Sequence, residues 1–339
     1  MHDALNAAEA WKRMVLRSMP QPAWLSPDAP QVDVVLSTRA RVMRNLRGHR
    51  FTHAATPHEL VLISREILAA AEGLGLEALK QVSNAEREYL VSCRLASPHF
   101  EWSEPGRMLL LNEERSLSLM VHEEDHLRLQ AVTAGWSPGT ADRLCKRCLQ
   151  GLEQTLEFAF SPHFGYLSAS PYNAGRGRRL SAMFHLIGLA QAKRLNSVLH
   201  ALGERGIAAR GLFGEASRAV GAYVQVSVIS GSRHDFMGAC EYLLREERES
   251  RQEVGRDVLE EKAIRVHEFA MESKSLSLAD SLRILAWIRW ASLYGIRGFP
   301  KGPRMADRLL TMLEPRVAQD PERLAIERAA MLRSALTPL

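Results

Sequence analysis

The sequence predicts an α+β fold in which a mainly antiparallel sheet is flanked by helices and followed by a helical C-terminal domain. Strand-like and helix-like segments mix irregularly over roughly the first two-thirds of the chain, without the regular strand–helix alternation of a parallel sheet. From about residue 242 onward the apolar spacing is helical. Because 339 residues exceed what one core usually holds, we expect two domains, residues 1–250 and 251–339.

The composition is that of an ordinary globular protein, with 46% hydrophobic and 24% charged residues. A net charge of +5 and only 6% aromatic residues do not favour a nucleic-acid-binding module. The first residues lack the apolar core of a secretory signal, and no apolar run is long enough to span a membrane. Four cysteines are few for this length, so we expect a cytoplasmic protein. Together with the charge and the lack of a long apolar run, we expect it to bind neither nucleic acid nor a membrane.

Apolar spacing and turn residues predict the elements in chain order. In the first domain we expect helices at residues 3–18, 57–80 and 137–159, a proline-containing loop at 20–30, and strands at 32–37, 87–95 and 107–121, the last with a turn near 112–115. In the second part we expect helices at residues 243–254, 257–271, 277–296, 305–314 and 320–336.

Residues 121–130, VHEEDHLRLQ, place Glu123 and Glu124 close to His126 and Arg128. This segment offers a proton acceptor and an anion clamp together. If it is extended, side chains alternate between faces, and Glu124 rather than Glu123 shares a face with Arg128. The alternative interpretation is a charged surface turn at the end of a strand.

Residues 37–51 carry five arginines directly after a predicted strand. Arg39 and Arg41 would point to the same side if the strand continues, and two adjacent guanidinium groups repel each other unless an anion lies between them. A polyphosphate fits, because the planar guanidinium binds phosphate oxygens in pairs. A solvated basic edge is the alternative.

Two later segments combine glycine with charge. NAGRGRR at residues 173–179 lies just before an expected helix, where backbone amides and guanidinium groups suit an anion. RGLFGE at residues 210–215 offers one cation, Arg210, and one anion, Glu215. Neither is a GxGxxG or Walker loop, and each is also compatible with an ordinary polar loop.

Cys145 and Cys148 form a single CxxC pair, without a second pair or a histidine at ligand spacing. Zinc or redox use is one interpretation. We favour the other, a pair of small buried residues on one helix.

Four motifs, STRARVMRNL at residue 37, HEEDHLR at 122, SPYNAGRGRRLS at 170 and RGLFGE at 210, resemble those of the phosphagen (guanidino) kinases in order and approximate spacing. Within that family the chain is most similar to the bacterial protein-arginine kinases. The resemblance runs over essentially the whole chain and implies a phosphagen-kinase-like catalytic domain at residues 1–250. It also implies ATP and Mg²⁺ as cofactors, with the metal held by the nucleotide phosphates.

The resemblance assigns roles to individual residues. Glu124 matches the catalytic glutamate, and Glu215 matches a second carboxylate that grips the guanidinium of the acceptor. His185 matches a position near the adenine, although it could equally be a core histidine. The family's clamp for the nucleotide phosphates corresponds here to Arg39, Arg41, Arg128, Arg179 and Arg210.

Several positions depart from the family pattern. Ser170 replaces a cysteine of the guanidino site, and a hydroxyl cannot ionise near neutral pH as a low-pKa thiol can. The remaining departures are Tyr172, His122, Arg176, the segment after Gln225, and LAIERA at residues 324–329 in place of a phosphoarginine-sensing motif. These changes keep open a second hypothesis, a catalytically impaired pseudokinase that binds nucleotide or a partner.

A third hypothesis is a kinase for a small free guanidine. Only 36 residues precede the STRAR motif, which leaves no room for the domain that closes over such a substrate in the animal enzymes, so we expect a protein-borne arginine as acceptor. The resemblance further implies marking of proteins for a Clp-type protease, an activator protein and homodimerisation through the C-terminal domain.

Overall fold

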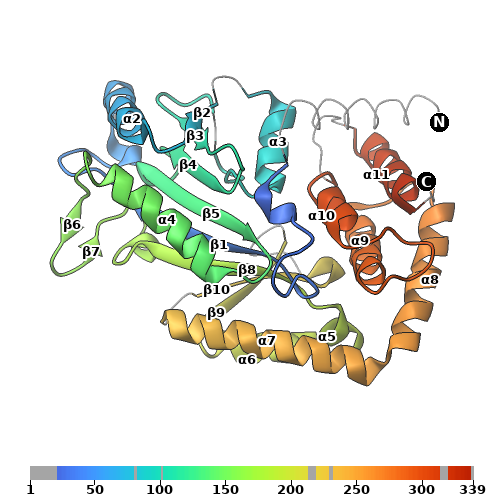
Figure 1. The fold of residues 1–339 in the computed structure, drawn as a ribbon. Helices are drawn as coiled ribbons and strands as arrows, with labels where there is room; N and C mark the ends of the chain where they lie inside the picture. The colour runs from blue at the N-terminus through green and yellow to red at the C-terminus, as the bar shows by residue number, and fades with distance from the viewer. Residues whose placement is uncertain are drawn as a thin grey trace.

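The computed structural model describes residues 21–79, 82–100, 102–212, 219–228, 232–313 and 320–336. The helix expected at residues 3–18 and the expected site residue Glu215 lie outside these ranges. A mainly antiparallel sheet with flanking helices lies beside a helical C-terminal part, as Figure 1 shows. The predicted fold class is therefore confirmed.

Within the described residues, the main sheet has eight strands in the order β2-β3-β4-β5-β1-β8-β10-β9, and every pairing is antiparallel. β6 and β7 form a separate hairpin. The strands are β1 Val35–Arg44, β2 Glu77–Ala78, β3 Met108–Leu111, β4 Leu117–Val121, β5 Leu127–Ala134, β6 Phe160–Ser161, β7 Gly165–Tyr166, β8 Arg178–His185, β9 Ile207–Gly211 and β10 Tyr223–Val228.

Several helices begin directly after a capping residue. α2 and α7, for example, start after Thr56 and Ser232, each of which forms a reciprocal capping box with an acidic residue three positions on. The helices are α2 Pro57–Ala71, α3 Asn84–Ser92, α4 Pro138–Leu152, α5 Ile187–Gln191, α6 Leu195–Gly203, α7 Arg233–Val254, α8 Arg256–Glu272, α9 Leu278–Leu293, α10 Arg304–Leu310 and α11 Pro321–Leu336. No helix in the described ranges is both long and apolar enough to cross a membrane.

One face of the sheet is apolar and is covered by helices. Ala40 and Val42 of β1 belong to the same core cluster as Cys145 and Cys148 of α4. Burial raises the pKa of these two thiols to about 12 and about 11, so they stay protonated near neutral pH. The CxxC pair therefore lies in the core, as the favoured interpretation predicted.

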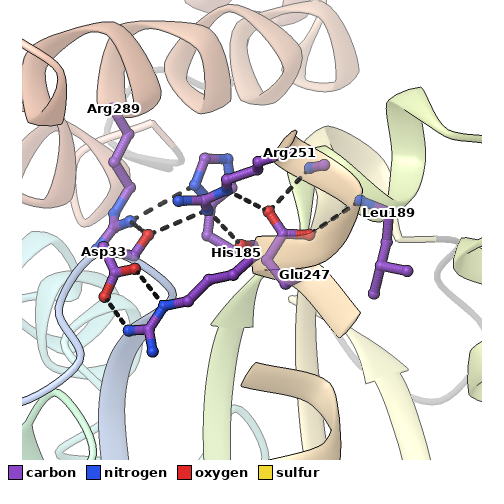
Figure 2. A network of polar contacts seen from close by, with 8 residues as sticks. Asp33, His185, Leu189, Glu247, Arg251 and Arg289 are labelled. Carbon is purple, nitrogen blue, oxygen red and sulfur yellow. Dashed lines mark hydrogen bonds and ion pairs between the residues drawn. The ribbon is translucent and has the colours of Figure 1, made fainter. Parts of the chain in front are cut away.

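Arg289, which forms a buried ion pair within the helical C-terminal part, also connects that part to the segment just before β1. Arg289 of α9 binds Asp307 of α10 at 2.7 Å through its Nε. Its Nη2 donates to the carbonyl oxygen of Val32 at 2.6 Å and its Nη1 to that of Asp33 at 3.4 Å. Figure 2 shows Arg289 reaching toward the sheet from above, with Arg251 of α7 on the other side of the network. These contacts fix the helical part against the strand that carries Arg39 and Arg41.

Two element predictions were wrong. Residues 87–95, expected as a strand, lie largely in α3, because Ser83 and Glu86 cap a helix whose Tyr89 and Leu90 pack beneath β3 and β4. The helix expected after Arg179 is instead strand β8, which pairs with β1 on one side and β10 on the other. Tertiary pairing overrides the helical propensity of its Leu, Ala and Met residues.

Other boundaries shifted. α2 ends at Ala71 rather than near residue 80, because Gly73, two residues later, adopts a φ of +76° that is incompatible with a helix. α4 ends at Leu152 rather than near residue 159. The helical segments expected after residue 242 correspond to α7–α11. α7 runs through the expected domain boundary to Val254, so a division at residue 250 stays a prediction.

Candidate active site

The sheet face opposite α4 carries a group of arginines. Arg39 and Arg41 of β1 are two positions apart, so they point to the same side. The register places Arg179 of β8 directly opposite Arg41 and Arg128 of β5 opposite Met43. Arg210 of β9 lies opposite Gln225 of β10. Alternation along each strand thus gathers arginines from four strands on one face.

Neighbouring polar side chains hold these arginines in place. Arg39 donates through Nε to Ser181 Oγ at 3.2 Å and through Nη2 to Gln225 Oε1 at 3.2 Å. Arg179 Nη2 donates to Ser227 Oγ at 2.9 Å. Serine and glutamine orient a guanidinium group without neutralising its charge, so these contacts leave the face strongly positive.

The charge of this face is poorly compensated. Burial lowers the pKa of both Arg39 and Arg41 well below its ordinary value, and repulsion from Arg128 and Arg179 lowers it further. The Nε atoms of Arg41 and Arg128 are buried and have no hydrogen-bond partner among the described residues. A bound polyanion would satisfy such donors and relieve the repulsion. The arrangement therefore suits nucleotide phosphates.

Arg128 pairs with Glu123, not with Glu124. Its Nη1 lies 2.7 Å from Glu123 Oε1. The segment between β4 and β5 bends, with His122 at a φ of +58°, so the alternation assumed from the sequence does not hold there. Burial disfavours the charged form of Glu123, but Arg128 and hydrogen bonds outweigh this and hold its pKa below the ordinary value. The regular alternation assumed from the sequence was wrong, but Glu124 and Arg128 do line the same cavity.

Glu124 is exposed and faces a cavity of about 880 Å³. Its Oε2 accepts a hydrogen bond of 2.8 Å from Asn173 Nδ2. The volume lies in the range typical of small-molecule sites. Besides Glu124, the cavity is lined by charged, polar and small residues that include Arg41, Arg128, Arg176, Arg178, Arg179, Arg210, Ser170, Tyr172 and Asn173.

Asp125 anchors the loop that carries Ser170. Its Oδ1 accepts from Asn45 Nδ2 at 2.6 Å and from the Ala169 amide at 2.7 Å, while Oδ2 accepts from Ser168 Oγ at 2.7 Å. A buried carboxylate with three donors is a rigid anchor. Glu124, immediately before it, is thereby held close to the Ser170 loop.

His126 completes this support. Its Nδ1 accepts from the Leu46 amide at 3.0 Å, and its Nε2 lies 2.8 Å from the carbonyl oxygen of Arg50. Burial lowers the pKa of His126 to about 4, so the ring is neutral near pH 7. A neutral imidazole can accept through Nδ1 and donate through Nε2, which both contacts require.

The structure brings most of the expected site residues together. Glu124, Ser170, Arg41, Arg128, Arg179 and Arg210 line one cavity, and Arg39 lies on the same face of the sheet. Glu215 cannot be placed, because residues 213–218 lie outside the described ranges.

His185 lies elsewhere. It is fully buried at the end of β8, stacked on Tyr223 with 5.0 Å between ring centroids, and is not among the residues that line the cavity. Burial and the charges of Arg289 and Arg251 lower its pKa well below the ordinary value. Figure 2 shows its ring between Arg289 and Arg251. The placement favours the core-histidine interpretation over a contact with adenine.

Sequence reasoning missed two residues. Glu123 was set aside in favour of Glu124, yet it provides the counter-charge of Arg128. Arg94, which follows α3 and has a φ of +63°, reaches the same face of the sheet. Its Nη1 donates to Ser37 Oγ at 2.5 Å, and its positive charge helps to lower the pKa of Arg39. The positive φ and the long-range approach leave no signal in the local sequence.

Arginines from four strands, the exposed Glu124 and a tightly anchored loop form an arrangement that suits phosphoryl transfer from a nucleotide to a cationic acceptor. Residues 63–242, more than half of the chain, match the family model "ATP:guanido phosphotransferase, C-terminal catalytic domain". The chain therefore belongs to the ATP:guanido phosphotransferase family.

Curated relatives are similar over nearly the whole length. The protein-arginine kinase of Pelotomaculum thermopropionicum is 31% identical over 312 residues, covering 86% of this chain and 87% of the relative. The protein-arginine kinase of Moorella thermoacetica is 31% identical over 340 residues, covering 92% of this chain and 97% of the relative.

Solved structures support the fold. A lombricine kinase superposes with a TM-score of 0.56 at 22% identity, covering 68% of this chain and 72% of that chain. The duplicated taurocyamine kinase of Schistosoma mansoni gives a TM-score of 0.58 at 19% identity, covering 78% of this chain and 39% of that chain.

Proposed function

We propose that the protein is an ATP-dependent protein-arginine kinase, which transfers the γ-phosphoryl group of ATP to a guanidinium nitrogen of an arginine side chain in a protein. The observation that carries the proposal is the convergence of Arg41, Arg128, Arg179 and Arg210 with Glu124 on one cavity. The curated relatives named protein-arginine kinase support the same acceptor.

The arginines bind and orient the nucleotide. Guanidinium groups pair with phosphate oxygens and stabilise the charge that develops during transfer. Arg39, held by Ser181 and Gln225, contributes its charge from beside the cavity. A Mg²⁺ ion held by the ATP phosphates would supply further charge stabilisation when bound.

Glu124 acts on the acceptor. A guanidinium has a pKa above about 12, so it arrives protonated and its nitrogens are poor nucleophiles. A carboxylate that hydrogen-bonds the guanidinium orients one nitrogen toward the γ-phosphorus and accepts its proton. The N–P bond forms while the bond from the γ-phosphorus to the bridging oxygen breaks, and ADP leaves with that electron pair. Asn173 holds the Glu124 carboxylate in place through Oε2, and Glu215 is assigned the second grip on the guanidinium.

Ser170 lies in the same cavity at the position where the family carries a cysteine. Its hydroxyl can donate to or accept from the acceptor, but it supplies no negative charge at neutral pH. The site therefore depends more heavily on its carboxylates, and a slower phosphoryl transfer is expected.

The biological setting belongs to the same proposal. We assign the protein a cytoplasmic location, protein substrates that are marked for a Clp-type protease, regulation by an activator protein and homodimerisation through α8–α11. These assignments rest on the resemblance to the bacterial protein-arginine kinases.

The proposal is tested by incubating the purified protein with Mg·ATP and casein and searching for phosphoarginine by mass spectrometry at neutral pH. Wild-type protein is expected to produce phosphoarginine, and Glu124→Ala is expected to produce none. A parallel assay of ADP release with free arginine separates a protein kinase from a kinase for a small guanidine. Nucleotide binding without phosphoarginine in either sample would favour a pseudokinase.

A further inference from the structure

Three large aromatic side chains near the cavity are strongly exposed: Phe160 at 58%, Phe164 at 71% and Tyr172 at 91% of their full surface. We call these three residues the aromatic rim. Single exposed apolar residues are common on protein surfaces, but a group of them at the edge of a site marks an interaction surface.

The backbone places the three residues together. Phe160 and Phe164 lie on the β6–β7 hairpin, and Tyr172 lies on the loop that follows it. Two backbone hydrogen bonds join the segments: Tyr166 N donates to Gly175 O at 2.8 Å, and Gly175 N donates to Tyr166 O at 3.0 Å. A Cβ on Gly165 would lie only 2.7 Å from Gly175 O, so the segments are in direct contact.

The hairpin is held in a fixed position. The Arg44 guanidinium carbon lies 3.4 Å from the centroid of the Tyr166 ring, and the Phe160 ring packs edge-on against Tyr166 at 5.3 Å. Figure 1 shows β6 and β7 projecting at the end of the sheet away from the helical C-terminal part. The hairpin and the Phe160 ring are thus held in place before binding, which lowers the cost of ordering them.

The rim is continuous with the catalytic cavity. Tyr172 is itself one of the cavity-lining residues, and the next residue, Asn173, binds the Glu124 carboxylate. A free guanidine compound is small enough to lie wholly inside the cavity, beside Glu124. A polypeptide that places an arginine side chain there also continues out of the cavity, and a path past Tyr172 leads onto the adjoining hairpin.

We propose that the aromatic rim binds apolar residues that flank the acceptor arginine of a polypeptide substrate. The inference rests on the proposed function and adds a substrate preference to it. The three side chains of the rim are uncharged aromatic rings. Contact with them therefore favours apolar flanking residues such as leucine and contributes little to the binding of serine.

The test uses two fluorescent peptides of equal length and charge, each with a single arginine, flanked by leucines in one and by serines in the other. Binding is measured by fluorescence anisotropy with a non-hydrolysable ATP analogue present. Wild-type protein is expected to bind the leucine peptide about tenfold more tightly than the serine peptide, given partial burial of two or more apolar side chains.

Two variants give the decisive comparison. Phe160→Ser/Phe164→Ser is expected to lose most of the preference for the leucine peptide while binding the nucleotide analogue as the wild type does. Leu68→Ser, on α2, removes an apolar side chain that is 38% exposed and lies outside both the rim and the proposed dimer surface, and it serves as the control. It is expected to keep the preference.

Equal affinity of the wild type for both peptides would overturn the inference, as would an equal loss of the leucine preference in the Leu68→Ser control. A wild-type dimer that the double variant dissociates, with the peptide preference unchanged, would also overturn it by showing that the rim joins two copies. Peptide binding requires no phosphoryl transfer. A preserved leucine preference without any phosphoarginine would therefore contradict the proposed kinase function and leave the rim as a peptide-binding surface.

Discussion

The adjacent carboxylates Glu123 and Glu124 are predicted to have separable roles. Glu123 is the buried partner of Arg128, and Glu124 is the exposed carboxylate in the cavity. Replacing each by glutamine keeps the shape and removes the charge. Glu123→Gln should mainly reduce stability, and Glu124→Gln should mainly reduce the rate of phosphoryl transfer.

The magnitudes follow from burial. The Glu123 and Arg128 side chains are only 9% and 10% exposed, with 2.7 Å between Oε1 and Nη1. Removing one partner of a buried pair costs about 3–5 kcal/mol. Because glutamine can still accept a hydrogen bond from Arg128, we expect a loss of about 3 kcal/mol in the free energy of unfolding. Glu124 is exposed, so its replacement should change stability by less than about 0.5 kcal/mol while the rate falls by about 10²–10⁴-fold.

The assays are urea unfolding followed by circular dichroism and the rate of phosphoarginine formation. The pH dependence gives an independent check, because the folded-state pKa of Glu123 lies below its ordinary value of 4.5. The stability that Glu123 contributes is therefore fully present above pH 4.5 and is lost as pH falls through the lower folded pKa. The gap between wild type and Glu123→Gln should be constant from pH 5 to 8 and close at lower pH.

The reasoning is refuted if Glu123→Gln unfolds at the same urea concentration as the wild type. It is also refuted if Glu124→Gln retains the wild-type rate, or if the two variants lose stability equally.

Three further predictions follow from the same structure. Asp307→Asn should lower the free energy of unfolding by about 3 kcal/mol, since it leaves Arg289 buried without a counter-charge, and Arg289→Met/Asp307→Leu should recover much of the loss in urea unfolding. Arg41→Ala should weaken ATP binding in calorimetry by about thirtyfold, because a charge-assisted hydrogen bond contributes about 2 kcal/mol, while Arg47→Ala, exposed and paired with Glu157, should not. The pKa of His126 is about 4 in the folded protein and 6.5 ordinarily, so only the unfolded chain binds this proton as pH falls from 6.5 to 4. The free energy of unfolding of the wild type should therefore fall by about 3 kcal/mol over this range. In His126→Gln, urea unfolding at several pH values should show no such loss.

The sequence predicted the parts of the site that depend on local geometry. Arg39 and Arg41 share a face because the strand that carries them is regular, and the period of two holds along β1. The helices of the C-terminal part were predictable because their apolar spacing is long and uninterrupted. The gathering of Arg128, Arg179 and Arg210 around Arg41 required the family resemblance, since strand order is not encoded in any one segment.

The errors arose where tertiary contacts decide the outcome. β8 carries good helix formers but is a strand, because it fills the gap between β1 and β10. Glu123 rather than Glu124 meets Arg128 because His122 turns the chain at a positive φ, which no apolar pattern indicates. His185 ends in the core because β8, not a helix, carries it into the contact with α9.

The most direct test of the central claim is the chemical nature of the bond that the protein forms. Purified protein is incubated with casein and ATP labelled at the γ-phosphoryl group, and the labelled casein is divided between acid and neutral buffer before counting. Transfer to a guanidinium nitrogen predicts label that survives at neutral pH, is released in acid and is absent with Glu124→Gln. Label that resists acid, as phosphate esters of serine or threonine do, or that persists with Glu124→Gln, would contradict it.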